Sequence, residues 1–472
     1  MSKSKKVVIL GAGPAALSAG LTLLKAGFPV ILLEREKQVG GISKTVEYKG
    51  FRFDVGGHRF FTRSDEVMKL WQETLGKDFL LRPRLSRIYY QGKFFKYPIE
   101  LGDTLKKAGL RTSLLCMASF IRYHLFPIRP EKSFADWVTN RFGRKLFLMF
   151  FKSYTEKVWG ISTEELSADW AAQRIKGLSL WEAVKNSLFK PKKKIKTLIE
   201  EFHYPKYGPG MMYQAMADKI INLGGKIELG QTITVLNEEG RRIKSITAKD
   251  ENGEEIALEA DYFISTIPLP DTLRFLRPEL SEFEGVEKEL TFRDFISVNL
   301  IIKKKVVFPD NWIYVHDPRV KLGRIQNFKN WSEFMTPDER MTPIGCEYFC
   351  NQGDELWTTN DDKLIKLASR ELQKLGLIKK GMMVDGLVYR MRDAYPVYMG
   401  DYQKVVSRAK KELSKIENLQ IAGRGGMFRY NNMDHSILSG IYTAKNIMGE
   451  HHDVWQVNAE EEYHEIKKSA KG

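Results

Sequence analysis

The stretch VVILGAGPAALSAGLTLLKAGFPVILLE, residues 7–34, decides the fold of this 472-residue chain. It opens with four apolar residues, turns at Gly11-Ala12-Gly13, continues as an apolar helical stretch, and closes with a second apolar run that ends at Glu34. A strand, a glycine-rich loop, a helix and a second strand ending in an acid form the context that the Gly-x-Gly-x-x-Gly/Ala pattern requires. We therefore expect a βαβ unit that binds a dinucleotide, rather than a plain βαβ unit with glycines in its loop.

Each residue of this fingerprint has a physical role. Gly11 allows the tight turn, and Gly13 lets a pyrophosphate approach the backbone N–H groups at the start of the helix. The small side chain of Ala16 lets the helix and the strand pack closely. Glu34 lies 23 residues after Gly11 (34 minus 11), where its carboxylate can accept hydrogen bonds from ribose hydroxyls.

Further pieces of the chain extend this unit. Directly after it come Arg35, a glycine pair at 40–41 and Ile42, and much later come ADYFISTIP (260–268) and LQIAGRGG (419–426). In this order the pieces resemble glutathione-reductase-type flavoproteins, and among them the amine-oxidase-like members. The resemblance implies FAD as the cofactor, and since no second such glycine loop follows, no NAD(P) domain is expected.

The resemblance also implies that the FAD site is assembled from three stretches, near residues 7–62, 205–268 and 418–448. The residues implied to contact FAD are Gly11, Gly13, Ala16, Glu34, Arg35, Gly40, Gly41, Ile42, Gly57, His58, Ile233, Gly423, Arg424 and Met433.

The segments between these stretches predict two insertions, and the expected fold class is α/β. A Rossmann-like FAD-binding domain would be assembled from discontinuous segments, with a helical insertion, a β-sheet substrate domain and a tail. The predicted boundaries are 1–64, 203–284 and 401–450 for the FAD-binding domain, 65–202 for the mostly helical substrate domain, 285–400 for the β-sheet substrate domain, and 451–472 for the tail. Within the helical insertion, the apolar segment 113–126 is predicted to be a buried helix rather than a membrane-surface helix.

The most specific motif of the insertion is YTEKVWG, residues 154–160, followed by Arg174-Ile175. It is similar to UDP-galactopyranose mutases, which carry Tyr-Thr-Glu-Lys-x-Trp-Gly and then Arg-Ile. Other matches fall in the same order, at residues 57–62, 323–325 and 429–448. The resemblance spans nearly the whole chain and is thin between these motifs.

That resemblance implies an unusual use of the flavin. In those mutases N5 of reduced FAD attacks the anomeric carbon of the sugar, UDP leaves, and the sugar ring opens and recloses smaller before UDP returns. A planar guanidinium suits the departing diphosphate because it binds phosphate oxygens bidentately and stays charged. The resemblance implies Arg174 and Arg324 in this role, with His58 beside the flavin. The implied substrate-binding residues are Tyr154, Trp159, Arg174, Phe202, Arg324, Tyr395, Tyr430 and Asn431.

The chain departs from that family on the substrate side. Phe61 replaces a histidine beside the flavin, and Phe202 stands in place of a uracil-stacking tyrosine, with Tyr204 and Tyr207 as alternatives. Residues 430–433 (YNNM) replace the family's Tyr-Tyr-Asp-Met. FAD binding is therefore expected, and the identity of the sugar stays open.

Several of these assignments have structural alternatives. Arg174 could form an ion pair with a nearby glutamate, Arg324 could lie on a solvated strand face, Trp159 could be a core aromatic, and His58 could be a hydrogen-bonded structural residue. The functional alternative is an oxidoreductase of the amine oxidase or protoporphyrinogen oxidase type, and a further one is a non-catalytic FAD-binding protein.

Composition limits the partners. The net charge of +16 (75 Lys+Arg minus 59 Asp+Glu) favours an anionic partner, but without a nucleic-acid-binding motif we expect a small anionic substrate, a nucleoside-diphosphate sugar. No apolar run has the roughly 18 residues of a transmembrane helix. The three cysteines lack metal-ligand spacing, so no metal and a cytoplasmic location are expected. A homodimer and a weak association with a membrane surface stay open.

Overall fold

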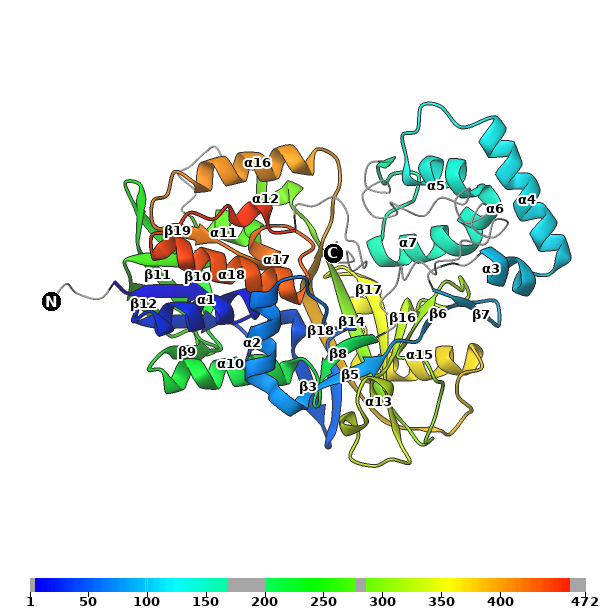
Figure 1. Cartoon of the computed structure of the whole chain (residues 1–472), viewed down its shortest axis with the longest axis horizontal. Coiled ribbons are helices and arrows are strands. Elements are labelled where there is room, and N and C mark those ends of the chain that lie inside the picture. The colour runs from blue at the N-terminus through cyan, green and yellow to red at the C-terminus, as the bar shows by residue number, and fades with distance from the viewer. Residues whose placement is uncertain (1–4, 98, 100, 169–200, 277–285, 459–472) are drawn as a thin grey trace, which may run out of the picture.

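The computed structural model describes residues 5–97, 99, 101–168, 201–276 and 286–458 (Figure 1). Its first unit is built on a five-stranded parallel sheet of order β19-β13-β1-β2-β9. The strands are β1 (Val7–Leu10), β2 (Val30–Glu34), β9 (Lys226–Leu229), β13 (Tyr262–Ser265) and β19 (Leu419–Ile421). Parallel strands are covered on both faces, which explains why β1 is a continuous apolar run with every side chain buried. Three pieces of sequence therefore meet in one sheet, which confirms the predicted α/β fold class.

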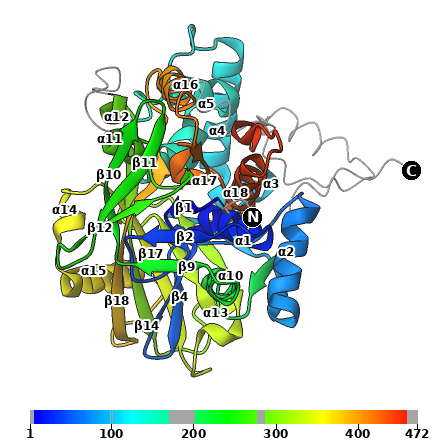
Figure 2. The same cartoon turned by 90° about the vertical axis from the view of Figure 1, so that its left-hand side faces the viewer.

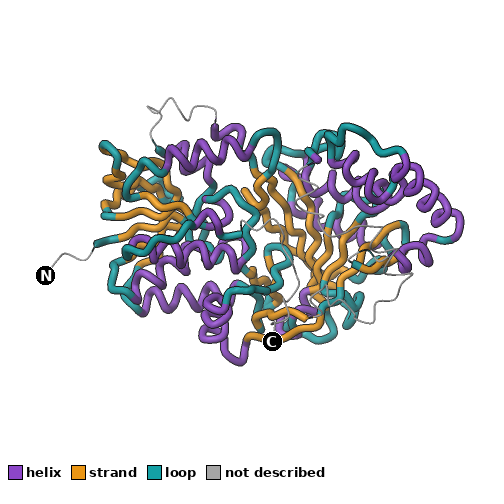
Figure 3. Tube along the Cα trace, turned by 45° about the horizontal axis from the view of Figure 1, so that its top comes forward, coloured by secondary structure: helices purple, strands orange, loops and turns teal. Residues whose placement is uncertain are grey.

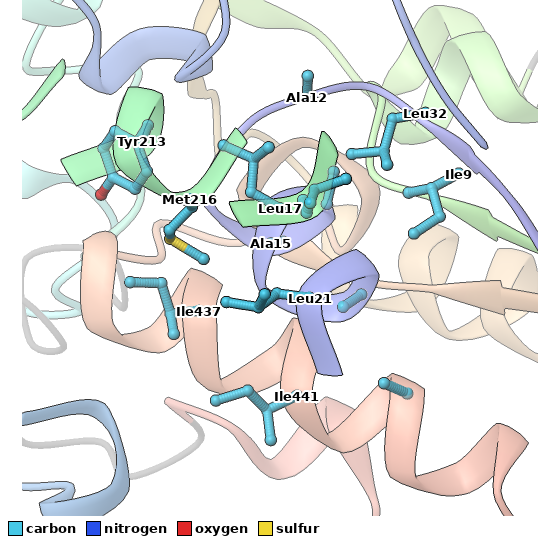
Figure 4. Packing of buried hydrophobic residues seen from close by; sticks show 14 of the residues in the cluster. Ile9, Ala12, Ala15, Leu17, Leu21, Leu32, Tyr213, Met216, Ile437 and Ile441 are labelled. Carbon is cyan, nitrogen blue, oxygen red and sulfur yellow. The ribbon is translucent and has the colours of Figure 1, made fainter. Parts of the chain in front are cut away.

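Three helices on one face of this sheet form its main core. They are α1 (Pro14–Lys25), α10 (Gly210–Asn222) and α18 (Met433–Ile447). Figure 4 shows Leu17 and Leu21 of α1 beside Met216 of α10 and beside Ile437 and Ile441 of α18. The contact between α1 and α18 brings the last α-helix of the described residues onto the first glycine loop.

The other face of the sheet is covered by a small antiparallel sheet and by further helices (Figure 2). These elements are β10 (Thr232–Glu239), β11 (Arg242–Lys249), β12 (Glu255–Glu259), α11 (Leu269–Phe275), α12 (Val286–Glu289), α16 (Tyr402–Leu413) and α17 (Gly423–Gly426). A hairpin, β3 (Thr45–Tyr48) and β4 (Phe51–Asp54), leads from the second glycine turn toward His58.

A seven-stranded sheet of order β18-β14-β17-β16-β15-β6-β7 forms the middle of the molecule (Figure 3). Its strands are β14 (Phe292–Ile302), β15 (Trp312–Val315), β16 (Arg324–Asn327), β17 (Thr342–Cys350), β18 (Met383–Pro396), β6 (Ser86–Tyr90) and β7 (Lys93–Lys96). Three helices accompany it: α13 (Phe328–Trp331), α14 (Glu355–Thr358) and α15 (Asp361–Lys374). The strands expected in 295–302, 343–349 and 383–390 are all present in this sheet.

The start of the predicted helical insertion lies outside the helical unit. The helix α2 (Asp65–Leu75) carries its apolar residues four apart, and this single stripe packs on α10 and α18. Strand β5 (Phe79–Pro83) pairs with β8 (Glu201–Pro205), while β6 and β7 join the seven-stranded sheet through β15.

The described helical unit therefore spans residues 101–168. Its elements are α3 (Leu101–Ala108), α4 (Leu110–Leu125), α5 (Phe134–Phe142), α6 (Arg144–Phe147), a π-helical turn (Leu148–Lys152) and α7 (Ser153–Trp159). The helix expected at 180–189 and the basic run at 192–196 lie outside the described residues.

The prediction that the segment 113–126 forms a buried helix is wrong. Only Cys116 and Phe120 of α4 are buried, and they pack toward α5 and α6, whereas Leu114 and Leu115 are more than half exposed. In this largely apolar segment the few polar residues do not form one stripe along the helix, so the sequence does not show which of its sides face solvent.

Candidate active site

Two glycine turns meet at the amino-terminal end of α1. Gly11 has a φ of +102°, and a Cβ placed on it would lie 2.5 Å from Oγ1 of Thr266. Gly41 has a φ of +55°, and a Cβ on it would lie 3.3 Å from Cα of Gly13. The two turns are tied by a hydrogen bond of 2.9 Å from the N–H of Gly40 to the carbonyl of Ala12. Backbone without side chains at a helix amino terminus suits a pyrophosphate, because the N–H groups and the helix dipole both favour an anion.

Glu34 lies at the carboxyl end of β2, as the fingerprint predicts. It is 8% exposed and accepts backbone hydrogen bonds from Ala12 at 2.7 Å and from Glu36 at 3.0 Å. Each carboxylate oxygen retains a second acceptor position, so these bonds orient the group without using up its capacity for ribose hydroxyls.

The third segment contributes Arg424 from α17. Its guanidinium carbon lies 4.1 Å from the ring centre of Tyr430 and 4.9 Å from that of Tyr395, and Nη1 donates to the carbonyl of Asn431 at 3.3 Å. Its Nε and Nη2 are buried without a hydrogen-bond partner among the described residues. Buried donors without a partner are rare in folded proteins, and they suit acceptor oxygens or nitrogens of a bound group. Together with the glycine turns, this residue fits FAD.

The other residues expected to contact FAD lie around this core. Gly423 has a φ of +81°, and a Cβ on it would lie 3.0 Å from Cβ of Ala15. Arg35 donates to Asp393 at 3.3 Å. Ala16 of α1, Ile233 of β10 and Met433 at the start of α18 are buried, while Ile42 and Gly57 are partly buried. Contact with FAD stays a prediction for each of these residues.

His58 lies where the FAD-binding unit meets the seven-stranded sheet. Its Nε2 donates to the carbonyl of Val55 at 2.8 Å, and a Cβ on the neighbouring Gly57 would lie 2.6 Å from Nε2 of Gln326. Burial, and the positive charges of Arg424 and Arg324, lower the pKa of His58 to about 4. The imidazole is therefore neutral at physiological pH.

Arg324 and Glu347 form a buried pair on the seven-stranded sheet. They are direct neighbours across β16 and β17, and Nε of Arg324 donates to Oε2 of Glu347 at 2.7 Å. Nη2 donates to the same carboxylate and, at 3.1 Å, to the hydroxyl of Tyr395. Burial alone lowers the pKa of Arg324, but Glu347, Tyr395 and Tyr154 raise it well above its usual value, so the guanidinium stays charged. With a side chain 17% exposed, Arg324 does not lie on a solvated strand face.

Sequence reasoning missed Glu347. The available signal was a carboxylate within the otherwise apolar stretch 342–350, where a buried charge requires a partner. Oε1 of Glu347 also accepts a hydrogen bond of 2.7 Å from Nε2 of Gln326. Both oxygens of the carboxylate are therefore held in place.

The YTEKVWG segment brings aromatic residues to this pair. In α7, Tyr154 stacks on His316 with ring centres 4.6 Å apart, and Trp159 meets Tyr395 edge-on at 6.4 Å. Nζ of Lys157 donates to three carbonyl oxygens at the end of β15 and before β16, at 2.7 to 3.2 Å, and so anchors α7 on the sheet. The structure thus brings Tyr154, Trp159, Arg324, Tyr395 and Tyr430 together.

His316 is a second residue that sequence reasoning missed. Burial and the nearby charge of Lys157 lower its pKa to about 3, and its Nδ1 is buried with no hydrogen-bond partner in the described part of the chain. A lone histidine at a strand end carries no sequence signal for this position.

The remaining predicted substrate residues are Phe202, Asn431 and Arg174, and of these Asn431 adjoins the group, since its carbonyl accepts from Arg424. Phe202 is 2% exposed and packs edge-on against Trp331 at 5.0 Å in an aromatic core. Asn431 is buried and accepts a hydrogen bond of 3.1 Å from Asn458. Arg174 lies outside the described residues.

Comparison with known proteins agrees with this architecture. A family model described as flavin containing amine oxidoreductase matches residues 15–448. A 4,4'-diapophytoene desaturase (4,4'-diapolycopene-forming) of Methylomonas sp is 24% identical over 320 residues, which cover 59% of this chain and 58% of that protein. An L-amino-acid oxidase of Sistrurus catenatus edwardsii is 30% identical over 122 residues, 23% of this chain and 24% of that protein. The chain thus spans less than two thirds of the length of these relatives.

Among solved structures, that of a reduced UDP-galactopyranose mutase matches with a TM-score of 0.83 at 22% identity, covering 96% of this chain and 98% of the other. At this identity the likeness shows the fold. The family match covers most of the chain, and the glycine turns and Arg424 fit the cofactor of that family. The chain belongs to the flavin containing amine oxidoreductase family and is an FAD-dependent flavoenzyme.

Proposed function

We propose that this flavoenzyme is a sugar-nucleotide mutase similar to UDP-galactopyranose mutase. The observation that carries the proposal is Arg324, a guanidinium held charged at an aromatic surface beside His58. An oxidase for an apolar substrate does not need a cation there, whereas a departing diphosphate does. The likeness over 96% of the chain to a UDP-galactopyranose mutase structure supports the same choice.

The residues of the site have distinct tasks in such a reaction. The glycine turns and Arg424 would hold FAD, which in its reduced form would supply a nucleophile for the sugar. Arg324 faces the negative charge that develops on the leaving diphosphate, and Glu347 and Tyr395 hold its guanidinium in one orientation. His58 stays neutral, so it orients neighbouring groups by hydrogen bonding without adding a third cation beside Arg324 and Arg424.

Aromatic side chains complete the proposed substrate site. Tyr154, which is partly exposed, offers a flat apolar surface for a nucleoside or a sugar ring, whereas Trp159 is only 6% exposed and supports Tyr395 from the core. Arg174 is proposed as the second arginine for the diphosphate, on the YTEKVWG resemblance alone.

The second candidate is an FAD-dependent oxidoreductase of the amine oxidase or protoporphyrinogen oxidase type. It is favoured by the sequence relatives, which are named as a desaturase and an L-amino-acid oxidase. In that reaction the flavin would accept a hydride, and Arg324 would serve a structural role through Glu347.

One experiment separates the two candidates. The purified protein is reduced with dithionite under anaerobic conditions, and its melting temperature is measured with and without UDP. Binding at 100 times the dissociation constant adds about 2.7 kcal/mol to the free energy of unfolding, so a mutase should show a clear upward shift. The absence of a shift with UDP, together with peroxide release from an amine or a porphyrinogen in air, would establish the oxidoreductase.

A further inference from the structure

The outer side of α4 is an apolar surface, which we call the α4 stripe. Its members are between 40% and 78% exposed: Leu110, Leu114, Leu115, Met117, Ile121, Leu125 and the adjoining Phe126. Side chains at 110, 114, 117, 121 and 125 are spaced by four, three, four and four residues, so they lie on one side of the helix. The opposite side, with Cys116 and Phe120, faces the helical unit. Large exposed side chains gathered in one place, unlike single ones, indicate an interaction site.

The position of α4 in the molecule leaves this stripe accessible. In Figures 1 and 3 the helix forms the outer edge of the helical unit, at the end of the molecule farthest from the five-stranded sheet. Within the described ranges, α4 packs mainly on α3, α5 and α6, which lie against its other sides.

The charges around the stripe are nearly all positive. Residues 101–126 contain Lys106, Lys107, Arg111 and Arg122 against the single acid Asp103, a net charge of +3 (four minus one, with histidine neutral). Arg111 and Arg122 lie near the two ends of α4. An apolar stripe bordered by cations is the pattern of a helix that lies in the plane of an anionic lipid surface.

We propose that α4 docks this enzyme on an anionic membrane surface, with the stripe in the interfacial layer and the basic residues at the lipid headgroups. Within the described residues no helix has the length and apolarity to span a bilayer. A second copy of the chain fits less well. A twofold interface would place one α4 surface of net charge +3 against another, and the like charges would repel.

Co-sedimentation with vesicles tests the proposal. The full-length FAD-loaded protein is mixed with vesicles of phosphatidylcholine, with or without phosphatidylglycerol, at low and at high salt. We expect it to sediment with the phosphatidylglycerol vesicles and to be released by salt. The variant Ile121→Glu/Leu125→Glu should lower the partition coefficient by roughly tenfold or more, and Arg111→Gln/Arg122→Gln should lower it by roughly tenfold and weaken its salt dependence.

A matched variant controls for surface charge and folding. Ile221→Glu/Leu223→Glu changes two side chains that are 55% and 50% exposed in and beside α10, compared with 49% and 65% for Ile121 and Leu125. It should bind vesicles as the wild type does, and all variants should keep the flavin absorbance per protein. The proposal is overturned if the wild type stays in the supernatant with anionic vesicles. It is equally overturned if the Ile121/Leu125 variant sediments like the wild type, or if that variant changes only a dimer to a monomer.

Discussion

Replacing Arg324 by glutamine removes the charge on which the proposed function depends. The substitution leaves Glu347, a carboxylate only 1% exposed, without the cation that lies 2.7 Å from it. Removing one partner of a buried pair costs about 3–5 kcal/mol. Because 17% of the Arg324 side chain is exposed and Gln326 still donates to Glu347, water and this amide offset part of the loss. We expect the free energy of unfolding to fall by about 3 kcal/mol.

The catalytic cost of the same change is separate from this loss of stability. Removing a donor that stabilises transition-state charge lowers turnover by about 10²- to 10³-fold. In the double variant Arg324→Gln/Glu347→Gln no buried charge is left unpaired, so most of the lost stability should return. Turnover should not return, since the cation that faces the diphosphate is still missing.

Urea unfolding and turnover of UDP-galactopyranose by the dithionite-reduced enzyme measure the two effects side by side. The matched control is Arg87→Gln/Asp310→Asn, which removes an ion pair joined by two hydrogen bonds of 2.7 and 2.6 Å between β6 of the same sheet and the segment before β15. It should keep the melting shift with UDP. If Arg324→Gln/Glu347→Gln also keeps the wild-type shift with UDP and the wild-type turnover, Arg324 does not bind the diphosphate and the reasoning fails.

Three further predictions concern single positions. Gly11→Ala should abolish FAD binding, measured as flavin absorbance per protein, because φ is +102° and the new Cβ would lie 2.5 Å from the hydroxyl oxygen of Thr266. Gly27→Ala controls for backbone strain and should keep FAD, because φ is +85° there but a new Cβ would meet no atom within 4 Å beyond its chain neighbours. Gly160→Ala should lower the free energy of unfolding by about 1–3 kcal/mol in urea, more than Gly27→Ala does, because its Cβ would lie 2.5 Å from the guanidinium carbon of Arg293. Burial raises the pKa of Asp54 to about 7, so between about pH 4 and pH 7 the folded state keeps a proton that the unfolded state has released. The free energy of unfolding should therefore fall by a few kcal/mol as the pH rises from 4 to 7. Urea unfolding measured at several pH values should show this fall in the wild type and not in Asp54→Asn.

Sequence reasoning succeeded where the structure depends on neighbours along the chain. The first strand, glycine turn, helix and second strand are contiguous, and their periodicity alone specifies β1, α1 and β2. The sheet that residues 86–96 join could not be predicted in the same way. Strand β6 pairs with β15, more than 200 residues later, and β7 pairs with β6; no local pattern states which sheet such a hairpin joins. The exposure of α4 was missed for a similar reason, since it depends on which elements cover the helix.

In the site, too, a local motif identifies a residue, whereas distant parts of the chain determine its behaviour. Arg324 could be singled out by its motif, but its behaviour is set by Glu347, which is opposite it only through the register of β16 and β17. That partner limits what the arginine can do. Nε and Nη2 are taken by Glu347 and Tyr395, whereas Nη1 donates to no residue that the structure describes.

A phosphate oxygen can therefore accept hydrogen bonds from Nη1 of Arg324 only. The bidentate contact that a free guanidinium makes through two nitrogen atoms is lost. A single guanidinium that binds through one nitrogen atom neutralises only part of the charge of a diphosphate, so a second cation has to complete the binding. The proposed function consequently requires a second arginine, for which the position of Arg174 in the motif is the candidate. Arg174→Ala should then lower turnover about as much as the Arg324/Glu347 double variant does, by about 10²- to 10³-fold. An equal turnover in Arg174→Ala and wild type would mean that Arg324 acts without it, and the two-arginine assignment would have to be abandoned.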